Sequence, residues 1–439
     1  MKKIIALISI TAIVGASAQK PWNMDECMAY AAEHASTVAQ AKWDVASATA
    51  SRTEAIADFF PSISAQVGGQ YSWGRNIDPE TNTYKDVTSF NNGYSLYASL
   101  TLFDGGQTLN RYRQARNERQ RHINATEMQR DDNAIAAMLA FADAVYYQSA
   151  IKIAQDRLSQ SQGMLTLTER QEELGIKGRP DVAQARATVA NDNYNLVHQQ
   201  NLYAQAMLTL RSAMNLPESE SLTLDTTSIS SVYTYAMEDS EQIYAKAIAT
   251  NPKAIDARLQ VKTQKYSYDI AKGSLLPSLT FNAGISTSYY KNIGGYPTPK
   301  FSEQLRNNKG EYIAATLSIP IFTCLSRYSA VKRTKYALEK AKEQLTEQNR
   351  KLHDDIAAAV MDKHGYALEI MSLQAKTDAD ADAYRLNARK YEEGLLSLID
   401  LQLSANTYFE SRVTLLQKQM LYILKDKLVE YYKGNRLWM

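Results

Sequence analysis

The chain contains two copies of one unit, and this duplication restricts its possible folds more than any other feature of the sequence. The segment FFPSISAQVGG at 59–69 resembles LLPSLTFNAGI at 275–285, which lies 216 positions further on. Gly175 and Gly394, each followed by an aspartate, lie 219 positions apart. Several matches at nearly one spacing predict two repeats of about 217 residues each.

Each copy carries a pair of strand-like segments, within 60–103 and 276–322. Apolar side chains alternate there with small polar ones, as in SISAQV from Ser62. This alternation is typical of a transmembrane β-barrel strand, and equally of a half-buried sheet in a soluble protein. Tyrosine and tryptophan gather near the strand ends, as they do at membrane interfaces. The polar segments 74–93 and 290–311 are expected to be exposed loops.

Helices are predicted for most of the remainder. Two proline-free runs, 107–174 and 326–393, are each long enough for a helix of ~100 Å. They end at breaks over 175–180 and 394–399. Shorter helices are expected over 24–58, 181–214, 241–274 and 400–432. Their lengths favour half-length helices stacked end to end beside the long ones, with 215–240 as an equatorial segment between the stacked pair.

The N-terminus has the pattern of a secretory signal peptide. Lys2 and Lys3 precede an apolar run over 4–14, and Ala16-Ser17-Ala18 matches an A-x-A cleavage site. The apolar run is too short to cross a bilayer as a helix. We therefore predict an exported chain with a signal peptide over 1–18, a first repeat over 19–214, an equatorial segment over 215–240 and a second repeat over 241–439.

Composition disfavours several functional classes. Lys and Arg number 49 against 47 Asp and Glu, and the two lysines of the signal peptide account for the difference, so nucleic-acid binding is not expected. The two cysteines, Cys27 and Cys324, form no CxxC motif, and the five histidines are scattered. We expect both cysteines to be free and buried. With no nucleotide-binding or hydrolase motif, the sequence predicts no enzyme, no metal and no cofactor.

A cluster of arginines follows the first strand pair. Basic side chains near a membrane edge can reach lipid phosphates, and a solvated helix face would explain them equally well. The cluster consists of Arg111, Arg113, Arg116, Arg119 and Arg121.

Four strands per chain cannot close a barrel, which needs about eight. An open strand edge cannot face lipid, because its backbone groups would lack hydrogen-bond partners. If the strands span a membrane, the chain must therefore combine its strands with those of identical copies. Three copies would supply twelve strands.

In these features the sequence resembles the TolC family of outer-membrane efflux channels. The resemblance covers essentially the whole mature chain. It rests on the duplication, the strand openings FFPSIS and LLPSLT, FDGG at 103–106, the segment at 22–34 and the glycine-to-aspartate turns at 175–181 and 394–400. It implies a mainly α fold with a small β part, in which three chains form a 12-stranded outer-membrane β-barrel above a periplasmic α-helical barrel.

The resemblance also implies a function and partners. The chain would be a homotrimeric, passive exit duct for efflux or type I secretion, in contact with outer-membrane lipid. It would dock to a periplasmic adaptor protein and an inner-membrane RND or ABC transporter. The alternative is that the chain is itself a periplasmic adaptor, although adaptors have one helical hairpin rather than two.

The same resemblance implies a periplasmic gate beside the tip turns at Gly175 and Gly394. In family members a tyrosine before the second glycine pairs with an aspartate after the first, and these residues correspond to Tyr391 and Asp181. Asp400 corresponds to the first member of an acidic ring at the entrance.

Two departures from the family pattern affect this gate. The second acidic position is Leu403, and Leu396 replaces an arginine that serves as a further latch. Asp181 and Asp400 could also act only as N-caps of the helices that follow the turns.

Overall fold

The computed structural model describes residues 21–78, 82–86, 88–225, 233–293 and 298–438. The predicted signal peptide lies outside these residues. The chain divides into two compact units, which we describe separately. The helical unit comprises the described residues of Met1–Ala39, Glu127–Asn251 and Leu352–Met439. The strand unit comprises those of Gln40–Thr126 and Pro252–Lys351.

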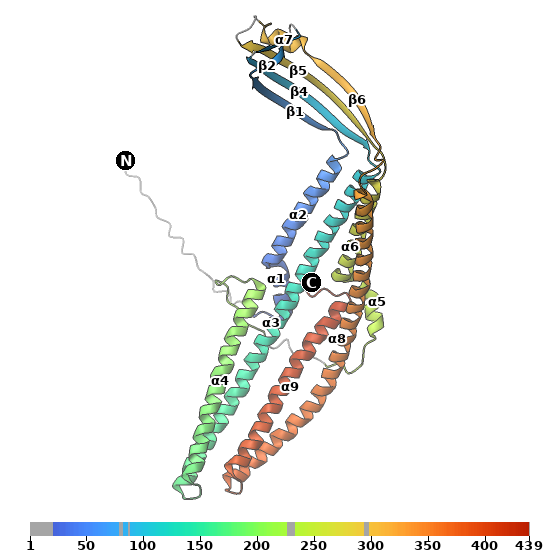
Figure 1. Ribbon diagram of the computed structural model, residues 1–439. Helices are drawn as coiled ribbons and strands as arrows, with labels where there is room; N and C mark the ends of the chain where they lie inside the picture. The colour runs from blue at the N-terminus through green and yellow to red at the C-terminus, as the bar shows by residue number, and fades with distance from the viewer. Residues whose placement is uncertain (1–20, 79–81, 87, 226–232, 294–297, 439) are drawn as a thin grey trace, which may run out of the picture. The chain divides into compact units, whose positions relative to one another are not determined.

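The helices of the two halves of the chain correspond in order and length (Figure 1). The first half has helices of 11, 22, 67 and 36 residues. The second half has helices of 11, 22, 67 and 35 residues. They are α1 (Met24–His34), α2 (Ser36–Ala57), α3 (Gln107–Glu173), α4 (Arg179–Met214), α5 (Ser240–Thr250), α6 (Pro252–Gly273), α8 (Ser326–Glu392) and α9 (Leu398–Tyr432).

Each helix expected before the strands is in fact two helices, so the prediction of single helices there is wrong. Between α5 and α6, Asn251 is extended (φ −67°, ψ 124°), because the ring of Pro252 disfavours a helical conformation in the residue before it. Between α1 and α2, Ala35 is extended as well (φ −61°, ψ 138°). The carbonyl of His34 accepts a hydrogen bond there from Nδ2 of Asn215 at 2.9 Å, a partner that the local sequence does not reveal.

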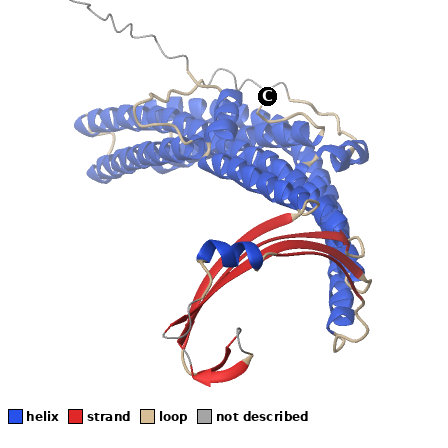
Figure 2. Cartoon of the chain, turned by 90° about the horizontal axis from the view of Figure 1, so that it is seen from above, coloured by secondary structure: helices blue, strands red, loops and turns tan. Residues whose placement is uncertain are grey.

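The strand unit contains a strongly curved sheet (Figure 2). Its strands are antiparallel and follow the order β1-β4-β5-β6. Its strands are β1 (Ser62–Ser72), β4 (Thr88–Phe103), β5 (Ser278–Ile293) and β6 (Gly310–Ser318). The loops between them are more structured than expected. The first contains a small hairpin, β2 (Arg75–Asp78) and β3 (Thr83–Asp86), and the second contains α7 (Phe301–Asn307), which packs against β5.

The strand register gives the sheet one apolar and one polar face, as the alternation predicted. Leu96 lies opposite Ala65 on β1 and opposite Ile285 on β5. The neighbouring Ser95, on the other face, lies opposite Gln66. Much of the apolar face is exposed in the single chain, which argues against a half-buried soluble sheet. It also includes Ile63, Val67, Ala98, Leu100, Leu279, Phe281, Ala283, Ile313, Ala315 and Leu317.

The helical unit has its main core where α1, α3 and α4 meet. Its largest buried side chains include Met28, Met138, Phe141, Leu210 and Met214. One stretch of α3 is long and apolar enough to cross a membrane by composition, but half of that stretch is buried within the protein, as expected of a core helix.

The two cysteines differ in their surroundings. Cys27 is buried in this core, and burial raises the pKa of its thiol to about 12. Cys324 is exposed in the single chain, so the prediction of a buried thiol there is wrong. It lies in the turn between β6 and α8.

Two of the clustered arginines connect helices within the strand unit. Arg119 Nε donates to Oγ1 of Thr49 on α2 at 2.9 Å. Arg121 forms an ion pair with Asp256 on α6 at 3.2 Å and another with Glu118 at 3.2 Å. These two side chains therefore bind other helices of the protein, rather than lipid phosphate or water alone.

The junction between β4 and α3 depends on two glycines. Gly105 and Gly106 both have positive φ, +70° and +81°. A Cβ on Gly105 would overlap the carbonyl oxygen of Gly273, whereas a Cβ on Gly106 would meet nothing within 4 Å.

This contrast predicts unequal effects of two alanine substitutions. Gly106→Ala should cost about 1–2 kcal/mol of folding free energy from the left-handed backbone alone. Gly105→Ala should cost more, because the chain must also separate from Gly273. Heat denaturation of the two purified variants in detergent, followed by circular dichroism, would show this order. Equal losses would contradict the close approach at Gly105.

Candidate functional site at the helical tips

Both helical hairpins of the helical unit turn through the same backbone motif. Gly175, at φ +75°, donates its N–H to the carbonyl of Glu172 at 2.9 Å. Ile176 donates to the carbonyl of Gln171 at 2.8 Å. This is the Schellman pattern, which requires a left-handed residue that glycine adopts without strain. Gly394, at φ +76°, ends α8 in the same way.

The two candidate gate aspartates lie in the first turn of the return helices. Asp181 Oδ2 accepts a hydrogen bond from the N–H of Gly178, the N-cap of α4, at 3.1 Å. Asp400 Oδ2 accepts one from Oγ of Ser397, the N-cap of α9, at 2.6 Å. Both therefore lie three residues after the N-cap, so their expected N-cap position is wrong, although both do support the helix start.

Tyr391 is fully buried beneath the second tip. Its hydroxyl lies 2.6 Å from Oγ1 of Thr168 on α3. Burial raises the pKa of this phenol, and the negative charge of Asp181 raises it further. Asp181 thus lies within electrostatic reach, but the hydroxyl bonds to Thr168. Gln171 adds bonds from its Nε2 to the carbonyls of Tyr391 at 3.4 Å and Glu392 at 3.3 Å.

Lys177 connects the two tips. Its Nζ donates to the carbonyl of Leu396 at 3.3 Å and lies 5.1 Å from the centre of the Tyr391 ring. An ammonium over an aromatic face is attracted by the ring's quadrupole. Lys177 stands two residues after Gly175, as Leu396 stands two after Gly394. The repeat spacing could therefore have identified Lys177 as a cation at the position equivalent to Leu396.

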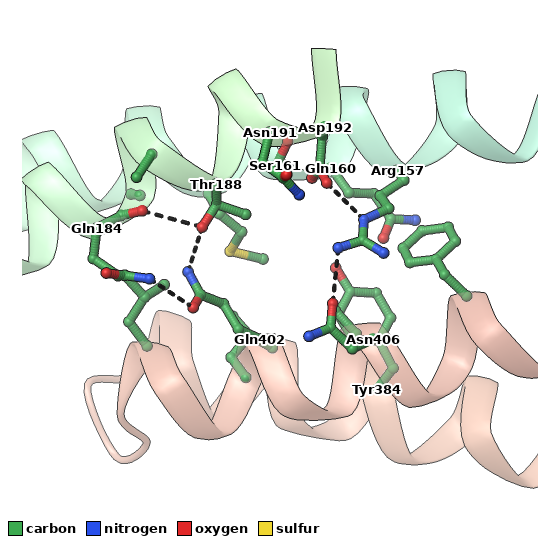
Figure 3. Close-up of a pocket in the computed structure, with 17 residues that line it drawn as sticks. Arg157, Gln160, Ser161, Gln184, Thr188, Asn191, Asp192, Tyr384, Gln402 and Asn406 are labelled. Carbon is green, nitrogen blue, oxygen red and sulfur yellow. Dashed lines mark hydrogen bonds and ion pairs between the residues drawn. The ribbon is translucent and has the colours of Figure 1, made fainter. Parts of the chain in front are cut away.

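A cavity of about 270 Å³ lies above the tips, lined by α3, α4, α8 and α9 (Figure 3). On one side Arg157 pairs with the buried Asp192 at 2.7 Å and donates to Asn406 Oδ1 at 2.8 Å. On the other side Gln402 Nε2 donates to Oγ1 of Thr188 at 2.7 Å. The bonds to Asn406 and from Gln402 both join the hairpin α3–α4 to the hairpin α8–α9.

The tips expose apolar side chains beside charged ones such as Glu173 and Arg179. Five apolar side chains there are each more than half exposed. They are Leu174, Ile176, Leu395, Ile399 and Leu403.

A curved sheet with an exposed apolar face and two long helical hairpins are the features expected of a channel of the bacterial outer membrane. The model of the outer membrane efflux protein family matches residues 29–216 and 243–423. The chain belongs to this family, and it is therefore an outer-membrane efflux channel protein rather than a periplasmic adaptor.

The sequence relatives are distant, whereas a solved structure has a closely similar fold. The toluene efflux pump outer membrane protein TtgC of Pseudomonas putida is 22% identical over 79% of this chain and 70% of its own length. The pyoverdine export outer membrane protein OpmQ of Pseudomonas putida is 22% identical over 88% of this chain and 85% of its own length. The crystal structure of CusC has a TM-score of 0.81 at 17% identity, over 94% of this chain and 92% of that one.

The contact between Tyr391 and Thr168 can be tested by a double-mutant cycle. Thr168 Oγ1 donates to the carbonyl of Met164 at 2.7 Å, so the Tyr391 hydroxyl donates to Thr168. Tyr391→Phe and Thr168→Val should each lower the free energy of unfolding by about 1 kcal/mol, through the shared hydrogen bond. The double variant should lose less than the sum, in urea denaturation followed by circular dichroism. Strictly additive losses would show that the two hydroxyls do not interact.

Proposed function

We propose that three copies of the chain close a twelve-stranded β-barrel and form a passive exit duct for small molecules. The duct docks to a periplasmic adaptor and receives its substrates from an inner-membrane transporter of the RND or ABC type. The observation that carries the proposal is the four-stranded sheet, which is strongly curved, apolar on one face and unpaired at β1 and β6. Twelve antiparallel strands from three chains would leave no unpaired edge in lipid.

Small-molecule efflux is favoured over protein secretion by the relatives, whose names specify toluene efflux and pyoverdine export. Docking to an adaptor is supported by the exposed apolar side chains at the tips, such as Leu395 and Ile399. These side chains would become buried against the end of a partner's helical hairpin. Cross-linking of the purified protein in detergent, with a three-chain product expected, tests the trimer, and a stable folded monomer would refute it.

The gate of this duct lies at the tips, where the hairpins α3–α4 and α8–α9 are held together in one chain. Lys177 binds the carbonyl of Leu396, and the Tyr391 hydroxyl binds Thr168. For the two hairpins to separate, at least the bond from Lys177 to Leu396 must break. Asp400 is exposed, and threefold symmetry would bring three such carboxylates around the channel axis. A ring of carboxylates attracts cations at the entrance.

If the bond from Lys177 to the Leu396 carbonyl acts as a latch that holds the tips closed, Lys177→Met should open the duct. The lost bond is charge-assisted and worth about 1.5–3 kcal/mol, which would raise the open population by roughly tenfold or more. We expect a higher mean conductance in planar bilayers and greater antibiotic sensitivity of cells that carry the variant. Lys177→Arg keeps the charge and the donors and should behave as the parent protein. Closed channels in Lys177→Met would exclude the latch.

The acidic ring can be separated from helix capping by two neighbouring substitutions. Asp400→Asn keeps an oxygen that can accept from Ser397 but removes the charge. Ser397→Ala removes the cap and leaves the charge. We expect Asp400→Asn to weaken cation selectivity and block by multivalent cations in bilayers, and Ser397→Ala to lower stability by about 1 kcal/mol with selectivity unchanged. If Asp400→Asn retains full selectivity, Asp400 serves the helix start alone.

A further inference from the structure

The two junctions between strand and long helix differ in chemistry although they occupy equivalent positions of the repeat. After β4, Asp104 Oδ2 accepts hydrogen bonds from the N–H and the hydroxyl of Thr108, at 2.8 and 2.7 Å. Two glycines follow it. After β6, the residues 219 positions further on are Thr323, Cys324 and Leu325. The carboxylate and both glycines have been replaced.

The second junction is apolar and strained. Cys324 and Leu325 adopt the left-handed conformation, with φ +48° and +60°, which is costly for residues other than glycine. Just before them, Ile321 is 94% exposed and Phe322 76% exposed. Such strain persists where surrounding structure imposes it, yet the single chain leaves these side chains uncovered.

The place of each strand in the sheet accounts for the difference. The polar, glycine-containing junction follows β4, which has a neighbour on both sides. The apolar junction follows β6, which forms one edge of the sheet. At the other edge, β1 is preceded by Phe59 and Phe60, and Phe60 is 66% exposed. Large apolar side chains are therefore more exposed at the open edges than at the equivalent interior positions, where Phe103 is 49% and Leu276 50% exposed.

We infer that Ile321 and Phe322 of one copy pack against Phe60 of the next copy, in an apolar seam between chains at the helix-proximal end of the barrel. This inference rests on the trimer proposed above. Along the sheet β1, β4, β5 and β6 alternate in direction, so β6 is antiparallel to the β1 of a following copy. The end of β6 then lies beside the beginning of that β1. Phe59 already contacts Tyr112 of its own chain, with ring centres 6.3 Å apart, which leaves Phe60 to face the neighbour.

Cysteine pairing tests the seam directly. In a Cys324→Ser background, Phe60→Cys and Phe322→Cys are combined and the purified protein is oxidised in detergent. Within one chain these positions flank opposite edges of a four-stranded sheet, three strand spacings or roughly 14 Å apart, too far for a disulfide. We expect covalently linked species of two and three chains on a denaturing gel, which collapse to one chain on reduction.

A matched control replaces Phe322→Cys with Phe103→Cys, at the end of the interior strand β4. That position lies beside the start of β1 in its own chain, so any disulfide to Phe60→Cys closes within one chain and the control should give no linked chains. Phe60→Ala and Phe322→Ala should also each lower the temperature at which the trimer dissociates, more than Leu276→Ala at the start of interior strand β5.

The outcomes separate the seam from the trimer. Intact trimers without linked chains, and without a loss of heat stability in the alanine variants, would show that these side chains face lipid, and would overturn the seam while leaving the trimer in place. A chain that stays monomeric under neutral cross-linkers would instead overturn the trimer, and the seam with it.

Discussion

Hydrogen bonding of the backbone in a medium without water is the constraint on which the rest of this structure depends. The sheet presents an apolar face that one chain leaves uncovered, and two edges whose N–H and C=O groups have no neighbour within the sheet. In hydrocarbon each unpaired group would cost several kcal/mol. A membrane sheet of four strands is therefore incomplete, and its curvature and alternating strand directions suit closure with identical copies.

The duplication supplies the framework for this closure, and the two copies differ in side-chain chemistry at equivalent positions. Helices of equal length recur in the same order, and both hairpins turn on a left-handed glycine. Some equivalent positions nevertheless carry side chains of different chemistry in the two copies. Lys177 faces the carbonyl of Leu396, its own counterpart in the repeat. Each copy thus contributes one half of a contact that neither could form alone.

The same asymmetry distinguishes the edges of the sheet from its interior. Gly105 is required where the strand unit brings its backbone against Gly273. Its counterpart Cys324 follows the edge strand β6, where the exposed apolar side chains lie next to the strand that would pair with another copy. Position in the sheet therefore explains why equivalent residues of the two copies have diverged.

The sequence by itself determined the elements with strong local signals. Alternating side chains predicted the four long strands and their two faces, because the period of a strand is two. Proline-free runs predicted α3 and α8 almost to the residue, and Gly175 and Gly394 predicted the turns, because few other residues adopt the left-handed conformation. The break before Pro252 could also have been recognised, since proline restricts the residue before it.

Tertiary structure decided what depends on residues distant in the chain. The break at Ala35 accompanies a bond from Asn215, and the Tyr391 hydroxyl bonds to Thr168, 223 residues earlier. The sequence placed Tyr391 and Asp181 near each other only through a family resemblance, which could not specify the hydroxyl's partner. The hydrogen-bond partner of the Tyr391 hydroxyl and the exposure of Cys324 depend on which residues lie nearby in three dimensions. No periodicity along the chain encodes these neighbours.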